Sequence, residues 1–354
     1  MNFIYDTNAL IQVVPNLKRS QKFLLDKFFP NMVMSDTEFV SIDIDVGIRR
    51  MSPFVSPLVE GKLVEQRRYQ TNSFKPAYIK DKRAPDLRKP VRRMIGERIG
   101  GELKGSEREA ANLEMEMTDQ IDLIDRRLEW MASQALVNGS VTIAGDGFPS
   151  VVIDFGRDPT LTVALTGAAK WDTAFSAVGA NGIFNTPSAN IEQWAHQILK
   201  KSGGVATDIV FTPTSWLLFS QDSSVAKSIF YPRSGNATID MGSQIQRGAQ
   251  YKGHWGQYDL WVYNDWYVDP NTNIETPMVA DGTVIMSGPD LLGTRSFGQI
   301  FDPAFNYQAL PYAPKTWIEN DPPQRMIMMQ SSPIVIPTRV NASFSASVAT
   351  PVVS

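Results

Sequence analysis

The sequence contains no cysteine and only two histidines, and it has no long uninterrupted run of apolar residues. The lack of cysteine excludes disulfide frameworks, thiolate metal sites and cysteine nucleophiles, and it fits a reducing compartment such as the cytosol. No stretch approaches 18 consecutive apolar residues, so no membrane span is predicted. The first residues have no basic flank before their apolar part, which argues against a secretion signal.

What is present is the composition of a folded chain. It has 354 residues, of which 43% are hydrophobic and 20% are charged. At about 150 residues per domain, this length provides for roughly two or three hydrophobic cores. A disulfide mini-protein, a collagen and a wholly disordered chain are all poor interpretations.

The formal net charge of -3 conceals an uneven distribution. Between Lys62 and Lys104 there are 13 Lys or Arg residues against 5 Asp or Glu residues, a local charge of +8. The rest of the chain therefore carries -11. Pro76, Pro85 and Pro90 interrupt the segment, so it cannot form one continuous helix. We call residues 62–104 the basic strap.

The basic strap can be a solvated surface loop, an arm that binds an acidic surface of another protein, or a nucleic-acid contact. Nucleic-acid-binding segments usually interleave aromatic residues with positive charge, and the strap has only Tyr69, Phe74 and Tyr78. Among the functional interpretations a protein partner is therefore favoured, with DNA second. The residues predicted to make such contacts are Arg67, Arg68, Lys82, Arg83, Arg88, Lys89, Arg92 and Arg93.

Recognisable catalytic and metal-binding motifs are missing from the sequence. Because His196 and His254 are the only histidines, a zinc site would need carboxylates for most of its ligands, and H-E-x-x-H does not occur. There is no G-x-S-x-G nucleophile elbow and no Walker A sequence. The sequence therefore predicts no catalytic residue, no metal ligand and no cofactor, and it argues against an enzyme.

The N-terminal part is predicted to form extended segments that do not build a core of their own. Residues 1 to about 40 mix short apolar pieces with Pro15 and Pro30, enough for one short helix but not for a core, so they are expected to lean on something else. Residues 38–46, EFVSIDIDV, alternate apolar and polar positions as a strand does. The run LVEQRRYQTNSF follows as a second, partly exposed strand. Together they predict a long antiparallel excursion.

The clearest element is an amphipathic helix from near Lys104 to Asn138. Its apolar residues recur at spacings of three and four, whereas charged residues, Glu129 among them, mostly fill the other faces. The apolar positions are Leu113, Met117, Ile121, Ile124, Leu128, Met131 and Ala135. At about 1.5 Å per residue this helix extends roughly 50 Å. A coiled coil is the alternative, but flanking heptads are missing, which favours a single long core helix.

The remaining patterns mix strands and helices. SVTIAGDGFPSVVIDFG predicts a hairpin that turns at Asp146-Gly147, and residues 159–189 read as a weakly structured connection. A helix is predicted over 191–201, ending at Gly203-Gly204. DIVFT, DLWVY and TVIMSG read as strands of a mixed α/β region over roughly 166–305, and RMIMMQ and SPIVIPTRV as strands of the tail.

These patterns together favour assembly. An N-terminal stretch of about 100 residues that forms an arm and a long excursion cannot bury its own apolar faces, so neighbours must bury them. Reaching segments make head-to-tail contacts, which close into rings or shells where the rotation allows.

Six collinear segments resemble a known family. They are FVSPLVEG (54–61), SFKPAYIKDK (73–82), VVIDFGR (151–157), YKGHWGQYDLWVY (251–263), GTRSFGQIFD (293–302) and PKTWIENDPPQRMIMMQSSPIVI (314–336). In this order they resemble the major capsid proteins of lambda-like tailed phages, the major capsid protein E family, which has the Hong Kong 97 capsid fold. The resemblance covers roughly residues 30–345.

The resemblance implies an α+β fold with a defined order of parts. These are an N-terminal arm (1–40), an extended E-loop hairpin (41–95) lying across a neighbouring subunit, a peripheral domain (96–165 and 306–354) with a spine helix at about 104–138, and an axial α/β domain (166–305). The implied function is a structural subunit that self-assembles into the icosahedral head of a tailed bacteriophage enclosing double-stranded DNA.

The resemblance also implies partners and a location. The partners are many copies of the chain in hexamers and pentamers, a separate scaffolding protein, a portal, a decoration protein and non-specifically bound packaged double-stranded DNA, with no membrane. The location is the virion capsid, assembled in the host bacterial cytoplasm. Two alternatives stay open from the residues: a sequence-independent DNA-binding protein that uses residues 62–104, and a hydrolase with an unrecognised site.

Overall fold

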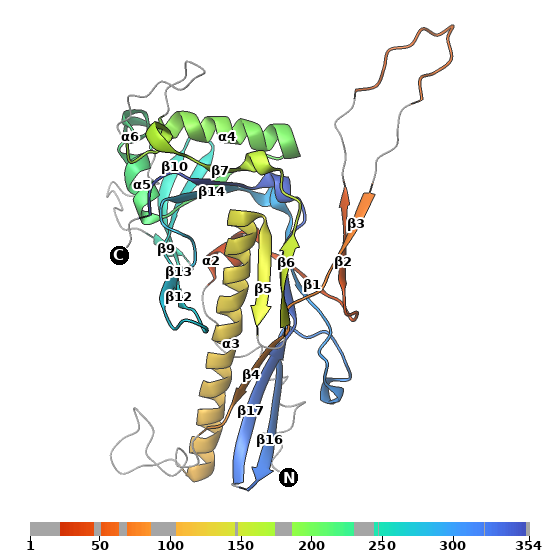
Figure 1. The fold of residues 1–354 in the computed structure, drawn as a ribbon, viewed down its shortest axis with the longest axis vertical. Coiled ribbons are helices and arrows are strands. Elements are labelled where there is room, and N and C mark those ends of the chain that lie inside the picture. The colour runs from red at the N-terminus through yellow and green to blue at the C-terminus, as the bar shows by residue number, and fades with distance from the viewer. Residues whose placement is uncertain are drawn as a thin grey trace, which may run out of the picture.

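The computed structural model describes residues 22–45, 51–63, 69–85, 104–145, 148–173, 186–229, 244–246, 248–321 and 323–351. A long central helix runs through the molecule, with a layered domain at one end and a narrow sheet beside the other, and a hairpin projects from its side (Figure 1). This mixture of helices and sheets confirms the expected α+β class.

The central helix α3, Gly105–Asn138, is the predicted amphipathic helix. All seven apolar positions of its stripe are buried, which confirms that it is a core helix. At its start, the Glu107 carboxylate accepts a hydrogen bond from the Lys104 backbone N–H at 2.8 Å. It ends at Gly139, whose φ of +70° lies in the left-handed region that favours glycine.

A seven-stranded mixed sheet forms the layered domain at the C-terminal end of α3, with strand order β7-β19-β14-β8-β11-β10-β9. The predicted strands DIVFT, DLWVY and TVIMSG are confirmed as β8, β11 and β14. The strands are β7 Thr162–Ala164, β8 Asp208–Phe211, β9 Gln244–Gln246, β10 Ala249–Trp255, β11 Tyr258–Tyr263, β14 Thr283–Ser287 and β19 Phe344–Ser347.

The central strands of this sheet place alternate residues in two cores. In β11, Leu260 and Val262 pack in the core that contains helix α4, whereas Trp261 and Tyr263 pack in the core that contains α3. Figure 1 shows α4 on one side of the sheet and the C-terminal end of α3 on the other. The helices on the first side are α4 Pro187–Ser202, α5 Pro213–Ser220 and α6 Ser223–Ser228.

Two parts of this domain differ from the sequence prediction. Helix α4 begins four residues before the predicted 191, since the Thr186 hydroxyl accepts a hydrogen bond from the Ala189 N–H and Pro187 fits the first turn. Within the connection expected at 159–189, β7 is a strand that pairs in parallel with β19. Three residues are too few for an alternation pattern to reveal a strand.

Smaller sheets lie along α3. Strand β17 pairs with β4 and β16, and β15 lies between β1 and β18. The antiparallel pairing of β5 and β6 confirms the predicted hairpin, whereas its predicted turn at Asp146-Gly147 lies outside the described residues. The strands are β1 Asn31–Met34, β4 Ile79–Arg83, β5 Ser140–Gly145, β6 Phe148–Asp154, β12 Trp266–Val268, β13 Glu275–Pro277, β15 Gly293–Phe297, β16 Ala313–Asn320, β17 Pro323–Ser331 and β18 Pro333–Pro337.

The strands cross the boundary expected at residue 306. β15 pairs with β18, beside α3, whereas the C-terminal strand β19 lies in the seven-stranded sheet. Short 3-10 helices connect these elements: Pro159–Leu161, Gly167–Ala169, Pro289–Leu291, Pro303–Phe305 and Val340–Ala342. In the described part of the chain, no helix has the length and apolar character to cross a membrane.

The apolar residues at 23–29 are buried within their own chain, so the expectation that something else covers them is wrong. They form the short helix α2, Phe23–Phe28, which packs against α3. The Phe23 ring centroid lies 5.0 Å from that of Trp261. A hydrophobic pattern shows that a segment needs cover but does not show which part of which chain provides it.

Candidate inter-subunit surface

The projecting hairpin is formed by β2 (Val40–Asp45) and β3 (Tyr69–Phe74), which pair antiparallel. This confirms the predicted antiparallel excursion. Its base is attached to the body by apolar packing: Val40 is buried, and the ring of Phe74 meets that of Phe155 edge-on at 5.6 Å. An ion pair between Lys75 and Glu38, 2.8 Å long, lies at the same base.

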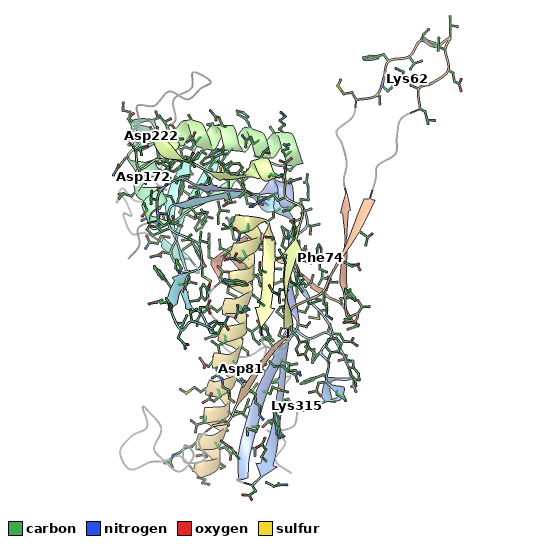
Figure 2. All side chains as sticks on the ribbon, viewed as in Figure 1. Lys62, Phe74, Asp81, Asp172, Asp222 and Lys315 are labelled. Atoms are coloured by element: carbon green, nitrogen blue, oxygen red, sulfur yellow. The ribbon has the colours of Figure 1, made fainter. Side chains whose placement is uncertain are left out.

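The tip of the hairpin, residues 51–63, is apolar and stands away from the body of the subunit (Figure 2). Met51, Leu58 and Leu63 are 90% to 103% exposed, and Phe54 is fully exposed. Lys62 is labelled at this tip in Figure 2. Because water solvates such side chains poorly, an apolar cluster of this kind marks a surface that another molecule covers.

Two of the contact residues predicted in the basic strap, Lys82 and Arg83, lie on β4 and have partners in their own chain. The Lys82 ammonium lies 3.5 Å from the Glu319 carboxylate and over the ring of Trp317. The Arg83 guanidinium binds the carboxylates of Asp81, Glu116 and Asp119 at 3.1, 3.0 and 2.5 Å. Although burial lowers the pKa of Arg83, hydrogen bonds with Asp119 and Glu116 raise it above its ordinary value.

The other predicted contact residues of the strap lie outside the described residues. They are Arg67, Arg68, Arg88, Lys89, Arg92 and Arg93. The structure brings Lys82 and Arg83 together with the acidic face of α3 and with β16. Both side chains therefore anchor the middle of the strap to the body.

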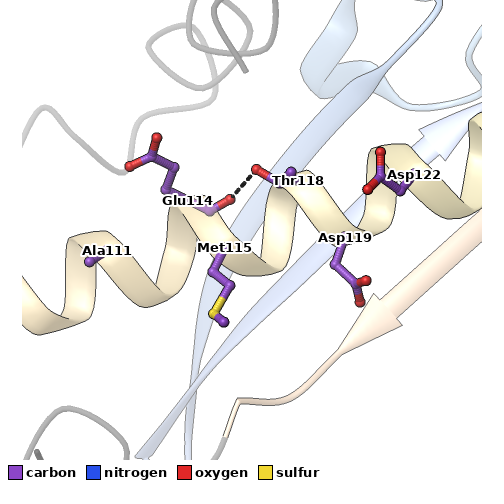
Figure 3. Close-up of a pocket in the computed structure, with 6 residues that line it drawn as sticks. All are labelled: Ala111, Glu114, Met115, Thr118, Asp119 and Asp122. Carbon is purple, nitrogen blue, oxygen red and sulfur yellow. Dashed lines mark hydrogen bonds between the residues drawn. The ribbon is translucent and has the colours of Figure 1, made fainter. Parts of the chain in front are cut away.

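The acidic face of α3 carries a shallow pocket of about 430 Å³, lined by Ala111, Glu114, Met115, Thr118, Asp119 and Asp122 (Figure 3). The Thr118 hydroxyl donates to the Glu114 carbonyl oxygen at 2.8 Å, so it is occupied by the helix backbone. The pocket presents the carboxylates of Glu114, Asp119 and Asp122 beside the side chain of Met115.

A second cleft of about 550 Å³ lies between α5 and strands β10 and β11. Trp216, Leu217 and Val262 give it an apolar wall, and Lys252 is its one cationic lining residue. Within the described residues no group of three or more His, Asp or Glu side chains is placed to hold a metal ion. Neither histidine lies among the lining residues of either pocket.

The sequence analysis missed a buried polar clamp that holds α2 on α3. The Glu129 carboxylate accepts hydrogen bonds from the Leu24 and Leu25 N–H groups, both at 2.9 Å, and from the Tyr263 hydroxyl at 3.0 Å. Glu129 is 2% exposed, so its assignment to the outer faces of the helix is wrong. Glu129 directly follows Leu128 in the sequence and so lies at the edge of the apolar stripe, which is the one indication of its burial.

Asp125 completes the clamp one helical turn earlier. Its carboxylate lies 2.6 Å from the Lys22 ammonium and also accepts a hydrogen bond from the Tyr312 hydroxyl. The two carboxylates thus bind Lys22 and the first turn of α2, and they connect them to Tyr263 of the seven-stranded sheet and to Tyr312. The clamp fixes the start of α2 on α3.

Comparisons with known proteins agree with this architecture. A family model for phage major capsid protein E matches residues 6–348. The major capsid protein of Escherichia phage N15 is 25% identical over 338 residues, covering 94% of this chain and 96% of that protein. That of Escherichia phage lambda is 25% identical over 326 residues, covering 89% of this chain and 92% of that protein.

A crystal structure of a prophage capsid protein from Escherichia coli CFT073 has a TM-score of 0.72 at 20% identity, covering 97% of this chain and 99% of that chain. This likeness confirms the Hong Kong 97-like capsid fold. The comparisons lend no support to the alternative of a DNA-binding protein. Because the family match spans almost the whole sequence, the chain belongs to the phage major capsid protein E family, and its function is that of a major capsid protein, which forms the icosahedral head of a tailed phage.

Proposed function

We propose that the copies of this chain in a head are joined by their hairpins, each of which lies across the next copy as an E-loop. The observation that carries this proposal is the apolar tip at residues 51–63. Burying one large apolar side chain contributes roughly 1.5 to 3 kcal/mol, so covering Phe54, Leu58 and Leu63 would contribute roughly 5 to 9 kcal/mol before the cost of association. Because the same contact repeats for every copy, a modest free energy per contact is sufficient to hold the shell together.

The proposed parts of the subunit follow the sheets. The peripheral domain contains α3 as its spine helix together with the sheets of β4-β17-β16 and β1-β15-β18 and the β5-β6 hairpin. The axial domain is the seven-stranded sheet with α4, α5 and α6, facing the five-fold and six-fold centres. The N-terminal arm (1–40) joins the peripheral domain through β1, and the E-loop (41–95) joins it through β4.

The strap residues complete the proposal. Arg67, Arg68, Arg88, Lys89, Arg92 and Arg93 would pair with acidic surface on adjacent copies, since the chain outside the strap carries -11. Lys82 binds Glu319 and Arg83 binds the α3 carboxylates, so these two residues would hold the middle of the strap on the body during that contact. Opposite charges on two regions of one chain fit a contact between unlike surfaces of two copies.

The remaining elements of the proposal concern other molecules. The head would contain hexamers and pentamers, a portal and packaged double-stranded DNA held without sequence preference, and a separate scaffolding protein and a decoration protein would act with it. Assembly would take place in the host bacterial cytoplasm. The subunit would have no enzymatic activity, in keeping with a family of structural capsid proteins.

Electron microscopy and light scattering on the full-length chain, produced with its neighbouring genes, test the hairpin contact. Phe54→Asp and Leu58→Asp should leave folded, soluble subunits, because neither side chain packs in the body, and should lower the yield of shells roughly tenfold or more. Ile274→Asp is the matched control, since Ile274 is 62% exposed and lies away from the hairpin. Normal shells from both tip variants would contradict the proposed contact.

A further inference from the structure

Strand β1 has two partly exposed faces and one unpaired edge in the described part of the chain. A strand points successive side chains to opposite faces, so a strand with one covered face shows alternating burial. In β1 all four residues are exposed, and the exposed fractions of Met32, Val33 and Met34 are 48%, 46% and 52%. Both faces of β1 are therefore left about half open.

The third open side is an edge. β1 pairs in parallel with β15, and within the described residues it is the outermost strand of that sheet. Alternate N–H and C=O groups of an edge strand are left without a strand partner and form a template for another strand. Phe39, 48% exposed, follows β1 on the way to the hairpin. An exposed apolar edge of this kind is a site for strand addition.

We infer that β1 is completed in the assembled head by residues 9–14 of a second copy, which add as a strand to its open edge. This inference rests on the proposed function, because it needs neighbouring copies. The segment reads Ala-Leu-Ile-Gln-Val-Val, without proline or charge, and is bounded by Asn8 and Pro15. Its β-branched residues favour a strand, and every one of its N–H groups can donate.

Other segments of the chain fit the edge less well. The hairpin tip is apolar, but Pro53 and Pro57 remove two donors within five residues, which prevents continuous pairing. Strands β2 and β3 read VSIDID and YQTNSF, which are too polar to cover Met32 and Met34. The family match begins at residue 6, so residues 9–14 are part of the matched sequence.

The length of chain allows the contact. Residues 9–14 are connected to α2 by the stretch that ends at Lys22, which the polar clamp holds on α3. Eight Cα-to-Cα steps lead from Val14 to Lys22 and can span at most about 26 Å at about 3.3 Å each. That distance is close to the diameter of a small domain. An arm leaving one body can therefore reach an edge on the adjacent body.

Because the chain has no cysteine, disulfide trapping can test the contact without a background thiol. Chains carrying Val33→Cys are produced together with chains carrying one cysteine at a time in place of Leu10, Ile11, Gln12, Val13 or Val14. Shells are purified, oxidised with dissolved oxygen and digested without reductant. Mass spectrometry then identifies disulfide-linked peptides that join the two kinds of chain.

The expected result is a link at alternate positions of the segment, since only every second side chain of a strand faces Val33. Val268→Cys replaces Val33→Cys in the control, because Val268 is an equally apolar strand residue, 59% exposed, in the distant β12-β13 pair, and it should give no link. Adding Ile11→Pro to the linking chain should abolish the link, because proline removes a strand donor.

Two results would overturn the inference. One is normal shells in which no linked peptide joins the two kinds of chain. The other comes from a chain that carries both cysteines: a link that forms there but not in the mixture of single-cysteine chains would show that the added strand belongs to the same subunit. A wild-type chain that forms no shells with its neighbouring genes would overturn the proposed function itself, and the electron micrographs distinguish that failure from a missing link.

Discussion

Glu129 is a carboxylate withdrawn from water at the junction of α2, α3 and β11. Burial raises its pKa to about 7, although hydrogen bonds from Leu25, Leu24 and Tyr263 act in the opposite direction, and the negative charge of Asp265 adds to the rise. Burial also raises the pKa of Tyr263, with the charge of Glu129 as the next cause. The folded chain therefore holds a proton on Glu129 more tightly than the unfolded chain, whose pKa is near 4.3.

This shift gives the stability of the subunit a defined pH dependence. The contribution of Glu129 is fully present below about pH 4.5 and is lost as the pH rises through about 7, because the folded state must then bury a charge. Over that range the loss is about 3 kcal/mol. Urea unfolding of unassembled subunits at pH 5 and pH 8 should show that Glu129→Gln weakens this fall in the free energy of unfolding.

The matched control is Glu114→Gln on the exposed face of the same helix. It should leave the difference between pH 5 and pH 8 as in the wild type. A Glu129→Gln variant with the full wild-type difference would show that another group is responsible.

At the scale of elements, the C-terminal end of α3 is capped by a cation from the loop that follows β6. The Arg157 guanidinium donates to the carbonyl oxygens of Leu136 and Val137 and to the Thr162 hydroxyl. Burial lowers the pKa of Arg157 to about 10. These carbonyls lack partners inside the helix, and a positive charge interacts favourably with this end of the helix dipole.

Arg157→Ala should therefore destabilise the subunit by about 2 to 3 kcal/mol, because two buried carbonyl groups would lose their donors. Chemical denaturation of the subunit measures this change. Arg126→Ala, an exposed residue of the same helix, should change the free energy of unfolding by less than about 0.5 kcal/mol. Equal effects of the two substitutions would contradict the capping role.

The sequence predicts well those elements whose hydrophobic pattern repeats many times. The stripe from Leu113 to Ala135 repeats over six intervals, so α3 and its burial follow from pattern alone. Strand β7, with three residues, and helix α2, with six, are too short for a period and are stabilised by tertiary contacts. Polar groups such as Glu129 and Asp125 cannot be placed by a hydrophobic pattern, because their burial depends on partners far away in the sequence.

The candidate surface is predictable to a similar extent. The excess of charge at 62–104 identifies a basic segment, but only the fold shows that Arg83 faces Glu116 and Asp119 on α3. Likewise FVSPLVEG is visible as an apolar run, and its position at the end of a projecting hairpin is a property of the three-dimensional structure (Figure 1).

At the scale of the whole molecule, the contacts of the strap within its own subunit can be separated from its proposed contacts with neighbouring copies. Arg83→Glu should lower the stability of the isolated subunit, because it places a fourth carboxylate beside three others. Arg92→Glu with Arg93→Glu should leave that stability unchanged and lower shell yield, as the proposed contact with neighbouring copies requires. Denaturation curves and electron microscopy of both variants provide the two readouts.

Shells of normal yield and form from the Arg92 and Arg93 double variant would contradict an intersubunit role for this part of the strap. An unchanged stability in Arg83→Glu would contradict the anchoring role of the β4 ion pairs. The two results are independent of each other, since one concerns the folded monomer and the other its association.

The narrow attachment of the hairpin makes it a lever. Its base is fixed by Val40 and by the edge-on contact of Phe74 with Phe155, whereas its tip lies about ten residues away. The 6 residues of β2 reach roughly 20 Å, so a tilt of about 10° at the base displaces the far end of the strand by roughly 3 Å. If neighbouring copies are joined by their hairpins as proposed, small rotations about this aromatic contact would let identical chains meet at different angles, as a closed shell of varying local curvature requires.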